Sequence, residues 1–344
     1  MSARRVLVTG VASGLGRQLV RQLAEDERIG SVIGVDTHPP RENIGRAEFV
    51  RADIRNPLIA KVITTSEVDT VVHLNVLATP LGAGGRAAMK ETNVIGTMQL
   101  LAACQKAPSV RTLVVKSTTA VYGSSPRDPA VYRENMEPRG LPASGYAKDA
   151  VEVEGYVRGF GRRRPDVALT VLRFTNFIAP DLETMLSRYF ALPVAPTMLG
   201  FDPRLQLCHL TDALAVLRMA CEGDRPGLYN VGGEGVLLLS QALRRLGRPS
   251  VPLVPGAIAL AGQLIRRLGL ADYSREQLRF LEHGRVVDTT RLQKEFGYVP
   301  AYTSAAAFED YAAANPGPLR AAPYAAIAEQ TVTGLLERRR LIRA

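Results

Sequence analysis

Residues 6–16 of the chain read VLVTGVASGLG. The apolar run Val6 to Val8 is typical of a strand that is buried on both faces of a parallel sheet. Three glycines follow it, Gly10, Gly14 and Gly16, and apolar residues then recur at helical spacing. Glycines between a strand and a helix allow a tight turn, and they let backbone N–H groups approach a pyrophosphate at the helix N-terminus. The stretch therefore predicts a dinucleotide-binding turn on a Rossmann-type sheet.

An acidic residue supports this interpretation and indicates which dinucleotide binds. Ser31 to Val35 is a second apolar segment, and Asp36 ends it about twenty residues beyond Gly16, which is the usual place of a ribose-binding acid. A carboxylate there accepts a hydrogen bond from a ribose 2′-hydroxyl and repels a 2′-phosphate. We therefore predict NAD rather than NADP as the cofactor. The alternative is a purely structural turn with a surface aspartate.

The segments that follow predict the fold class. Further buried strands are expected near residues 49–50 and at 70–74, 112–115 and 169–172, and helices at 58–65, 87–105 and 147–160. Strands that alternate with helices in this way indicate an α/β fold with a doubly wound parallel sheet. We predict an NAD-binding Rossmann domain at 1–176, to which later segments return. A smaller lobe at 177–330, mainly substrate-binding, would cap the carboxyl edge of the sheet, and 331–344 would form a basic tail.

Composition excludes several other classes of protein. The three cysteines, Cys104, Cys208 and Cys221, are far apart and lack metal-ligand spacing, so we expect no disulfides, no metal site and a cytoplasmic location. The formal net charge is +10, but the arginines are scattered and no nucleic-acid-binding motif accompanies them. We therefore expect no nucleic-acid partner. No apolar stretch reaches the roughly 18 residues of a membrane span.

Further motifs occur in register along most of the chain. They are NVIGT at 93–97, STTAVYG at 117–123, LRFTN at 172–176, HLTD at 209–212 and YNVG at 229–232. Together they resemble the extended short-chain dehydrogenase/reductase superfamily and, within it, the NAD-dependent epimerase/dehydratase family. The chain is also similar to actinobacterial members that are described as UDP-glucose 4-epimerase-like. The glycine turn is spaced G-x-x-x-G-x-G, as in the shorter members of the superfamily, so we expect a local rearrangement of this loop.

The resemblance implies which residues contact the cofactor and the substrate. The implied NAD contacts are Gly10, Ser13, Gly14, Leu15, Gly16, Asp36, Asp53, Ile54, Leu74, Asn75, Val76, Asn93, Ser117, Lys148 and Thr175. The implied substrate contacts are Asn176, Arg204 and Tyr122.

The catalytic motif departs from the pattern of the family, which is Tyr-x-x-x-Lys with a Glu four residues after the lysine. Lys148 precedes Glu152 by four, so it takes the place of the lysine, and Ser144 rather than Tyr146 then takes the place of the tyrosine. Residues two apart on a helix point about 200° away from one another, so Tyr146 and Lys148 cannot both face the nicotinamide on a regular helix. We therefore expect Ser144 to face the cofactor and Tyr146 to point away.

Two functions fit these observations. The first is an NAD-dependent oxidoreductase or epimerase that acts by transient hydride transfer on a small molecule, namely a nucleotide sugar or a related alcohol. Thr118 would bind the reacting oxygen, Lys148 would position the ribose, and the proton acceptor would be Tyr146 at a distorted helix start, Tyr122, or a water held by Ser144. The second is an NAD-binding redox sensor or scaffold without turnover.

Two further expectations concern surfaces. The resemblance implies a homodimer that pairs the helices near 87–105 and 147–160. Apolar residues at helical spacing between Pro255 and Leu270, beside Arg266 and Arg267, also allow a role at a membrane surface, although a helix packed on the capping lobe explains them better.

Overall fold

The computed structural model describes residues 3–78, 84–138, 140, 142, 145–223, 225–254, 260 and 275–317. Its main element is one sheet of seven parallel strands in the order β11-β6-β5-β4-β1-β2-β3. The strands are β1 (Arg4–Thr9), β2 (Ile29–Asp36), β3 (Glu48–Arg51), β4 (Thr70–His73), β5 (Thr112–Thr118), β6 (Ala168–Phe174) and β11 (Gly227–Val231). The predicted doubly wound α/β fold is confirmed.

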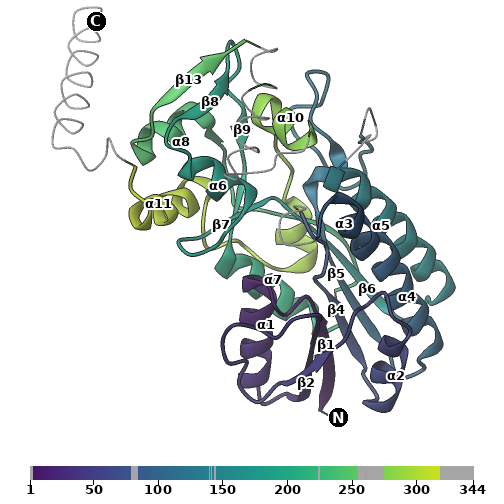
Figure 1. The fold of residues 1–344 in the computed structure, drawn as a ribbon. Coiled ribbons are helices and arrows are strands. Elements are labelled where there is room, and N and C mark those ends of the chain that lie inside the picture. The colour runs from purple at the N-terminus through teal and green to yellow at the C-terminus, as the bar shows by residue number, and fades with distance from the viewer. Residues whose placement is uncertain are drawn as a thin grey trace, which may run out of the picture.

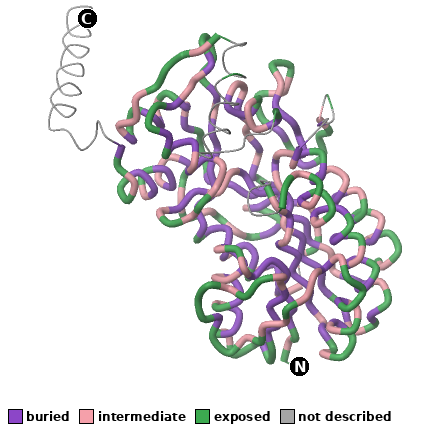
Figure 2. Tube along the Cα trace, in the orientation of Figure 1, coloured by how far each residue is buried: buried purple, intermediate pink, exposed green. Residues whose placement is uncertain are grey.

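Helices cover both faces of this sheet (Figure 1). One face carries α1 (Gly14–Glu25) and α7 (Leu210–Ala220), whose apolar residues pack with Val6, Val8 and Val114 of the strands. The other face carries α2 (Leu58–Thr65), α4 (Thr97–Lys106) and α5 (Gly145–Arg163), packed on Leu7, Val71 and Val115. The short α3 (Arg86–Lys90) and the π-helical turn η1 (Glu91–Gly96) lead directly into α4. Figure 2 shows the buried core between these layers.

The residues after β6 form a second lobe, which lies beside the sheet and has its own apolar core (Figure 1). Its elements are β7 (Asn176–Ile178), α6 (Met185–Ala191), β8 (Ala195–Met198), β9 (Arg204–Leu205), β10 (Leu207–His209), β12 (Leu237–Leu238), α8 (Leu239–Leu246), β13 (Ser250–Leu253), α10 (Arg275–His283), β14 (Gly284–Arg285) and α11 (Ser304–Ala314). Between these, β11 returns to the main sheet beside β6. Two short helical turns, η2 (Thr119–Tyr122) and η3 (Leu292–Phe296), complete the described elements.

Two of the sequence expectations fall outside the part of the chain that the structure describes. They are the apolar segment between Pro255 and Leu270, apart from Leu260, and the basic tail at 331–344. Among the described helices, none combines the length and apolar character needed to cross a bilayer.

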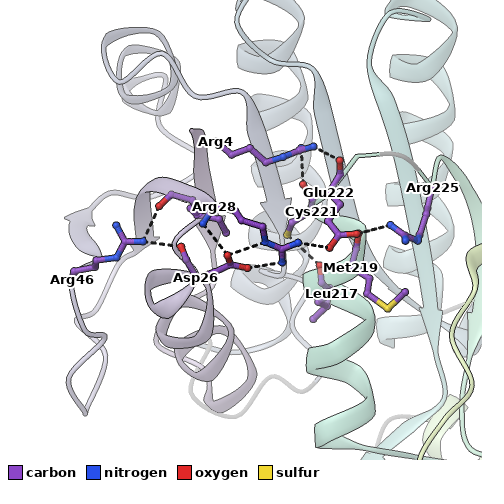
Figure 3. Close-up of polar contacts among 10 residues, drawn as sticks. Arg4, Asp26, Arg28, Arg46, Leu217, Met219, Cys221, Glu222 and Arg225 are labelled. Carbon is purple, nitrogen blue, oxygen red and sulfur yellow. Dashed lines mark hydrogen bonds and ion pairs between the residues drawn. The ribbon is translucent and has the colours of Figure 1, made fainter. Parts of the chain in front are cut away.

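A polar network joins the first strand to the last turn of α7, at the edge of the sheet where β1 begins (Figure 3). Arg4 donates to the backbone carbonyls of Cys221 and Glu222. The Glu222 carboxylate in turn accepts hydrogen bonds from Arg225 at 2.8 Å and from Arg28 at 3.3 Å. The network therefore ties together segments that are about two hundred residues apart in the sequence.

Candidate functional site: a cleft at the carboxyl edge of the sheet

A cleft of about 830 Å³ lies where the strands end and the second lobe begins. Residues at the ends of β1, β2, β4, β5 and β6 line one side of it, and residues of α6 and α10 line the other. Ligands of open parallel α/β sheets bind outside the carboxyl ends of the strands, so this cleft is the candidate site.

The glycine turn forms one wall of the cleft. Ser13 caps helix α1 by accepting a hydrogen bond from the Gly16 N–H at 3.1 Å. A Cβ at Gly16 would collide with the carbonyl oxygen of Gly10, so this glycine is needed for the close packing of the turn. A Cβ at Gly14 would meet only the Leu182 side chain, at 3.6 Å, and Gly14 lines the cleft together with Gly10, Ser13 and Leu15. No side chain of Gly14 therefore covers the backbone where a pyrophosphate would approach the helix N-terminus.

Asp36 stands at the end of β2, on the lining of the cleft. Its carboxylate accepts hydrogen bonds from the Ala12 N–H at 2.9 Å and from the Thr37 N–H at 2.7 Å. These two bonds fix the orientation of the carboxylate beside the glycine turn, and its remaining lone pairs can accept bonds from a ribose.

Asp53 also lines the cleft, and it forms an ion pair with Arg55 at 2.6 Å. Hydrogen bonds from Arg55 lower the pKa of Asp53 below its ordinary value. Ile54, which the resemblance placed on the cofactor, is instead buried outside the cleft lining, and its side chain fills the space beside Gly96.

The segment after β4 forms the floor of the cleft, to which Leu74, Asn75 and Val76 contribute. Asn93 lies behind this floor and is fully buried. Its side-chain oxygen accepts a hydrogen bond from the Leu77 N–H at 2.7 Å, and its side-chain nitrogen donates to the Leu77 carbonyl at 3.0 Å. The same nitrogen also donates to the Asp149 carboxylate. The structure thus gives Asn93 a supporting role in place of the predicted direct contact.

Ser117 and Thr175 line the cleft at the ends of β5 and β6. Ser117 donates to the Glu154 carboxylate at 2.6 Å. The Thr175 hydroxyl is buried and has no hydrogen-bond partner among the described residues. A buried hydroxyl without a partner is costly, and a polar ligand in the cleft would satisfy it. This orphaned hydroxyl, the bare glycine turn and the oriented Asp36 carboxylate together fit a bound NAD.

Tyr146 lies in this cleft, contrary to our expectation that it would point away. Burial raises the pKa of Tyr146 to about 12, and the neighbouring Thr118 side chain opposes this shift. Residues two apart on this helix do point about 200° away from one another, as expected. It is Tyr146, however, that faces the cleft, whereas Lys148 is exposed and does not line it. Ser144 lies outside the described residues.

Tyr146 was expected to point away because the catalytic motif was aligned by counting back from Glu152. Glu152 is half-buried and lies 3.9 Å from Lys90. The buried glutamate is Glu154, which accepts hydrogen bonds from Arg173 at 2.6 and 2.9 Å. Counting back from Glu154 aligns Tyr146 with the tyrosine of the family motif and places Ala150 where that motif has its lysine.

The three predicted substrate contacts occupy different places. Asn176 lines the cleft, whereas Arg204 lines a smaller neighbouring cavity of about 370 Å³. Tyr122 is buried outside the cleft lining, where its hydroxyl accepts from Arg173 at 2.8 Å and donates to Asn230 at 2.9 Å. The contact predicted for Tyr122 is therefore wrong, and its side chain braces β6 against β11.

Sequence reasoning missed the cationic residues of the cleft, which are Arg55, Lys116, Arg188 and Arg285. Arg285 donates to the Gly123 carbonyl at 2.6 Å and to the Ser124 hydroxyl at 2.9 Å, and burial lowers its pKa to about 10. It belongs to the short strand β14, about 140 residues beyond Tyr146, and no motif marks it. Lys116 belongs to β5, where period-two alternation with Val114 and Thr118 places these three residues on one face.

Comparison with known proteins agrees with the geometry of this NAD-type cleft. The chain belongs to the NAD dependent epimerase/dehydratase family, whose sequence model matches residues 6–232. An uncharacterised protein of Mycobacterium tuberculosis, Rv0501, is 51% identical over 311 residues, which are 89% of this chain and 82% of the relative. UDP-glucuronic acid decarboxylase 6 of Arabidopsis thaliana is 26% identical over 278 residues, covering 73% of this chain and 77% of the relative.

Solved structures show the same fold at low sequence identity. The UDP-glucose 4-epimerase of Thermotoga maritima, determined with UDP-glucose, superposes with a TM-score of 0.69 at 19% identity, over 90% of this chain and 98% of the other. MoeE5 in complex with UDP-glucuronic acid and NAD gives a TM-score of 0.70 at 20% identity, over the same shares of the two chains.

Proposed function

We propose that this protein is an NAD-dependent enzyme that oxidises a carbinol carbon of a nucleotide sugar or a related alcohol, in a reaction of the epimerase or dehydratase type. The position of Tyr146 beside Thr118 inside the NAD-type cleft carries this proposal. Paired hydroxyls of this kind, one of them a phenol, can bind the oxygen of a substrate alcohol and take up its proton.

Most of the predicted NAD contacts line the cleft, and we propose that they hold the cofactor. The glycine turn, with Ser13 and Leu15, would bind the pyrophosphate, and Asp36 would bind the adenosine ribose. Asp53 would lie near the adenine, and Leu74, Asn75, Val76, Ser117 and Thr175 would follow the remainder of the cofactor. When bound, NAD supplies the hydride acceptor of the reaction.

In this mechanism Tyr146 Oη takes the proton of the substrate hydroxyl, and Thr118 binds the same oxygen. The Ala120 N–H already donates to Thr118 Oγ1 at 3.1 Å, so the hydroxyl is held at the start of η2. Burial opposes ionisation of Tyr146, whereas the positive charge of Arg285 lowers the pKa of Tyr146. The phenol therefore requires nearby cations in order to act as a base close to neutral pH.

The lining of the cleft carries as many carboxylates as cations, but two arginines near its second-lobe side could bind an anionic substrate, and one of them, Arg188, is paired with Glu183. Arg285 lines the cleft from β14 and Arg188 lines it from α6. Guanidinium groups bind diphosphates well, and aromatic rings such as Phe177 and Phe280 of the lining add apolar surface. The fold neighbours captured with UDP-sugars agree with a substrate of this class.

Replacing the phenol tests the proposal. Tyr146→Phe should retain NAD affinity but lose about 10²–10⁴-fold in kcat, because a single proton-transfer group contributes this much. Turnover of a panel of UDP- and dTDP-sugars, followed by NADH absorbance and by product analysis, measures the loss. Tyr156→Phe is the matched control, because Tyr156 lies on the outward face of the same helix and is 40% exposed. Equal activity of the two variants would refute the role of Tyr146.

The alternative function is NAD binding without turnover. One observation favours it: helix α5 presents Ala150, not a lysine, four residues after Tyr146, and Lys148 is exposed. A wild-type protein that binds NAD tightly but forms neither NADH nor a sugar product with any member of the panel would support this alternative.

We also propose a homodimer formed through the outer faces of η1, α4 and α5. Ile95, Met98 and Tyr156 lie on these elements with 44%, 39% and 40% of their surfaces exposed. Apolar side chains gathered on neighbouring helices favour an interface between protein chains.

A further inference from the structure

Lys116 is a half-buried cation at the floor of the cleft. It stands on β5, two residues before Thr118, and lines the cleft with it. Its Nζ donates to the carbonyl oxygen of Val76, in the segment after β4, over 3.2 Å. No carboxylate of the described residues lies within 4 Å of this ammonium, and burial lowers the pKa of Lys116 to about 8.

The groups around Lys116 do not neutralise it. His73 on β4 is buried, and burial together with the nearby Lys116 lowers its pKa to about 3, so it carries no charge at neutral pH. The other titratable groups that line the cleft are Tyr146, whose pKa is raised, the cations Arg55, Arg188 and Arg285, the carboxylates Asp36, Asp53, Glu183 and Glu276, and His38. None of these described carboxylates forms an ion pair with Lys116. An ammonium held in this way destabilises the empty protein, and a ligand that accepts hydrogen bonds would offset that cost.

Helix α5 supplies no cation of its own to this part of the cleft. The face that carries Tyr146 continues at Asp149, Ala150 and Val153, all of them buried. Lys148 lies on the opposite, exposed face. Lys116 is thus the lysine that lines the described cleft, and it reaches it from the sheet instead of the helix.

We propose that Lys116 is the cationic cofactor-binding residue of this cleft, and that its ammonium donates hydrogen bonds to bound NAD from the floor formed by β4 and β5. In this role it does the work that the sequence predicted for Lys148. The inference deepens the proposed function but depends only on NAD binding, so it can be tested whether or not the protein turns over.

Titration calorimetry with NAD provides the first test. Lys116→Met should weaken NAD binding by about tenfold to a hundredfold, the usual effect of losing a charged hydrogen bond. Lys148→Met should bind as the wild type does, and so should Lys106→Met, which alters an exposed lysine at the end of α4. Wild-type affinity in Lys116→Met, or a comparable loss in Lys148→Met, would overturn the proposal.

The pH dependence of binding provides a readout that a purely structural lysine would not change. The pKa of free Lys116 is about 8, and a hydrogen-bond acceptor on the ligand raises it further in the complex. NAD affinity should therefore be full below pH 8 and fall as the pH rises above it. Lys116→Met should bind weakly at every pH and lack this fall. A fall of the same size in Lys116→Met would assign the effect to another group and refute the inference.

Chemical rescue keeps the test decisive even if Lys116→Met folds poorly. Lys116→Cys should also bind NAD weakly, and treatment with 2-bromoethylamine rebuilds a side chain of lysine length that ends in an ammonium. The native thiols Cys104, Cys208 and Cys221 are all buried, so the reagent should spare them. Recovery of NAD affinity to within threefold of the wild type supports the proposal. Complete modification, verified by mass spectrometry, without recovery contradicts it.

Discussion

The choice between the two nicotinamide cofactors depends on a single carboxylate, Asp36. It is held by two backbone N–H groups at the end of β2 and cannot turn away from an incoming 2′-phosphate. We expect NAD to bind at least tenfold more tightly than NADP, a difference of about 1.4 kcal/mol. Asp36→Ala should reduce that ratio. Calorimetry with both cofactors measures it, and equal affinities for the wild type would exclude this role of Asp36.

Two glycines of the same turn should respond differently to substitution. A Cβ at position 14 would meet only the Leu182 side chain, so we expect Gly14→Val to fold normally and to fill the space of the pyrophosphate. NAD binding should then fall below detection while the circular dichroism spectrum and Tm are retained. Gly16→Val would place a side chain against the carbonyl of Gly10 and should lower Tm as well. Unchanged NAD affinity in Gly14→Val would mean that the dinucleotide lies elsewhere.

The sequence predicts the place of a residue near the end of a strand. It does not predict which way a residue on a helix faces. Asp36 and Gly14 follow short apolar strands, and the position of a strand end fixes the edge of the sheet that they reach. Tyr146 was misplaced because two glutamates, Glu152 and Glu154, offered two registers, and only their burial distinguishes them. Lys116 gave no signal, since a lone lysine in a strand is usually exposed.

At the level of elements, we propose that the outer faces of η1, α4 and α5 form the interface of a homodimer. Met98→Glu would place a charge in the proposed interface, on whose elements the apolar side chains Ile95 and Tyr156 are also exposed, so the dimer should dissociate. Sedimentation velocity at micromolar concentration should show a dimer for the wild type and a monomer for this variant. Lys106→Glu, at the C-terminal end of α4, is the control and should remain dimeric. A monomeric wild type would refute the interface.

The elements themselves were the most predictable part of the chain. The helix expected at 58–65 has those bounds, and that expected at 147–160 extends from Gly145 to Arg163. The expected helix at 87–105 is present as three joined pieces, with η1 wound as a π-helix at its centre. Local periodicity specifies such helices well. It did not specify the short strands β9, β12 and β14 of the second lobe, because they are two residues long and pair only through tertiary contacts.

At the scale of the whole molecule, the stability of the sheet and the chemistry of the cleft can be separated, because the network of Figure 3 lies at the opposite edge of the sheet from the cleft. Arg4 caps the C-terminus of α7 by donating to the carbonyl of its C-cap residue, Cys221, and to the carbonyl of Glu222, which follows it. Arg4→Met should therefore cost about 1–2 kcal/mol and lower Tm by roughly 1–3 °C.

The neighbouring residue provides the control for this last prediction. Arg5 forms an ion pair with Glu67, and both side chains are largely exposed, at 46% and 71%. Pairs of this kind contribute about 0–1 kcal/mol, so Arg5→Met should leave Tm nearly unchanged. Differential scanning calorimetry compares the two variants, and NAD titration should give wild-type affinity for both, because neither side chain lines the cleft. If Arg4→Met weakened NAD binding at a temperature where it is fully folded, the cleft and the α7 cap would be coupled, and the independence argued here would be wrong.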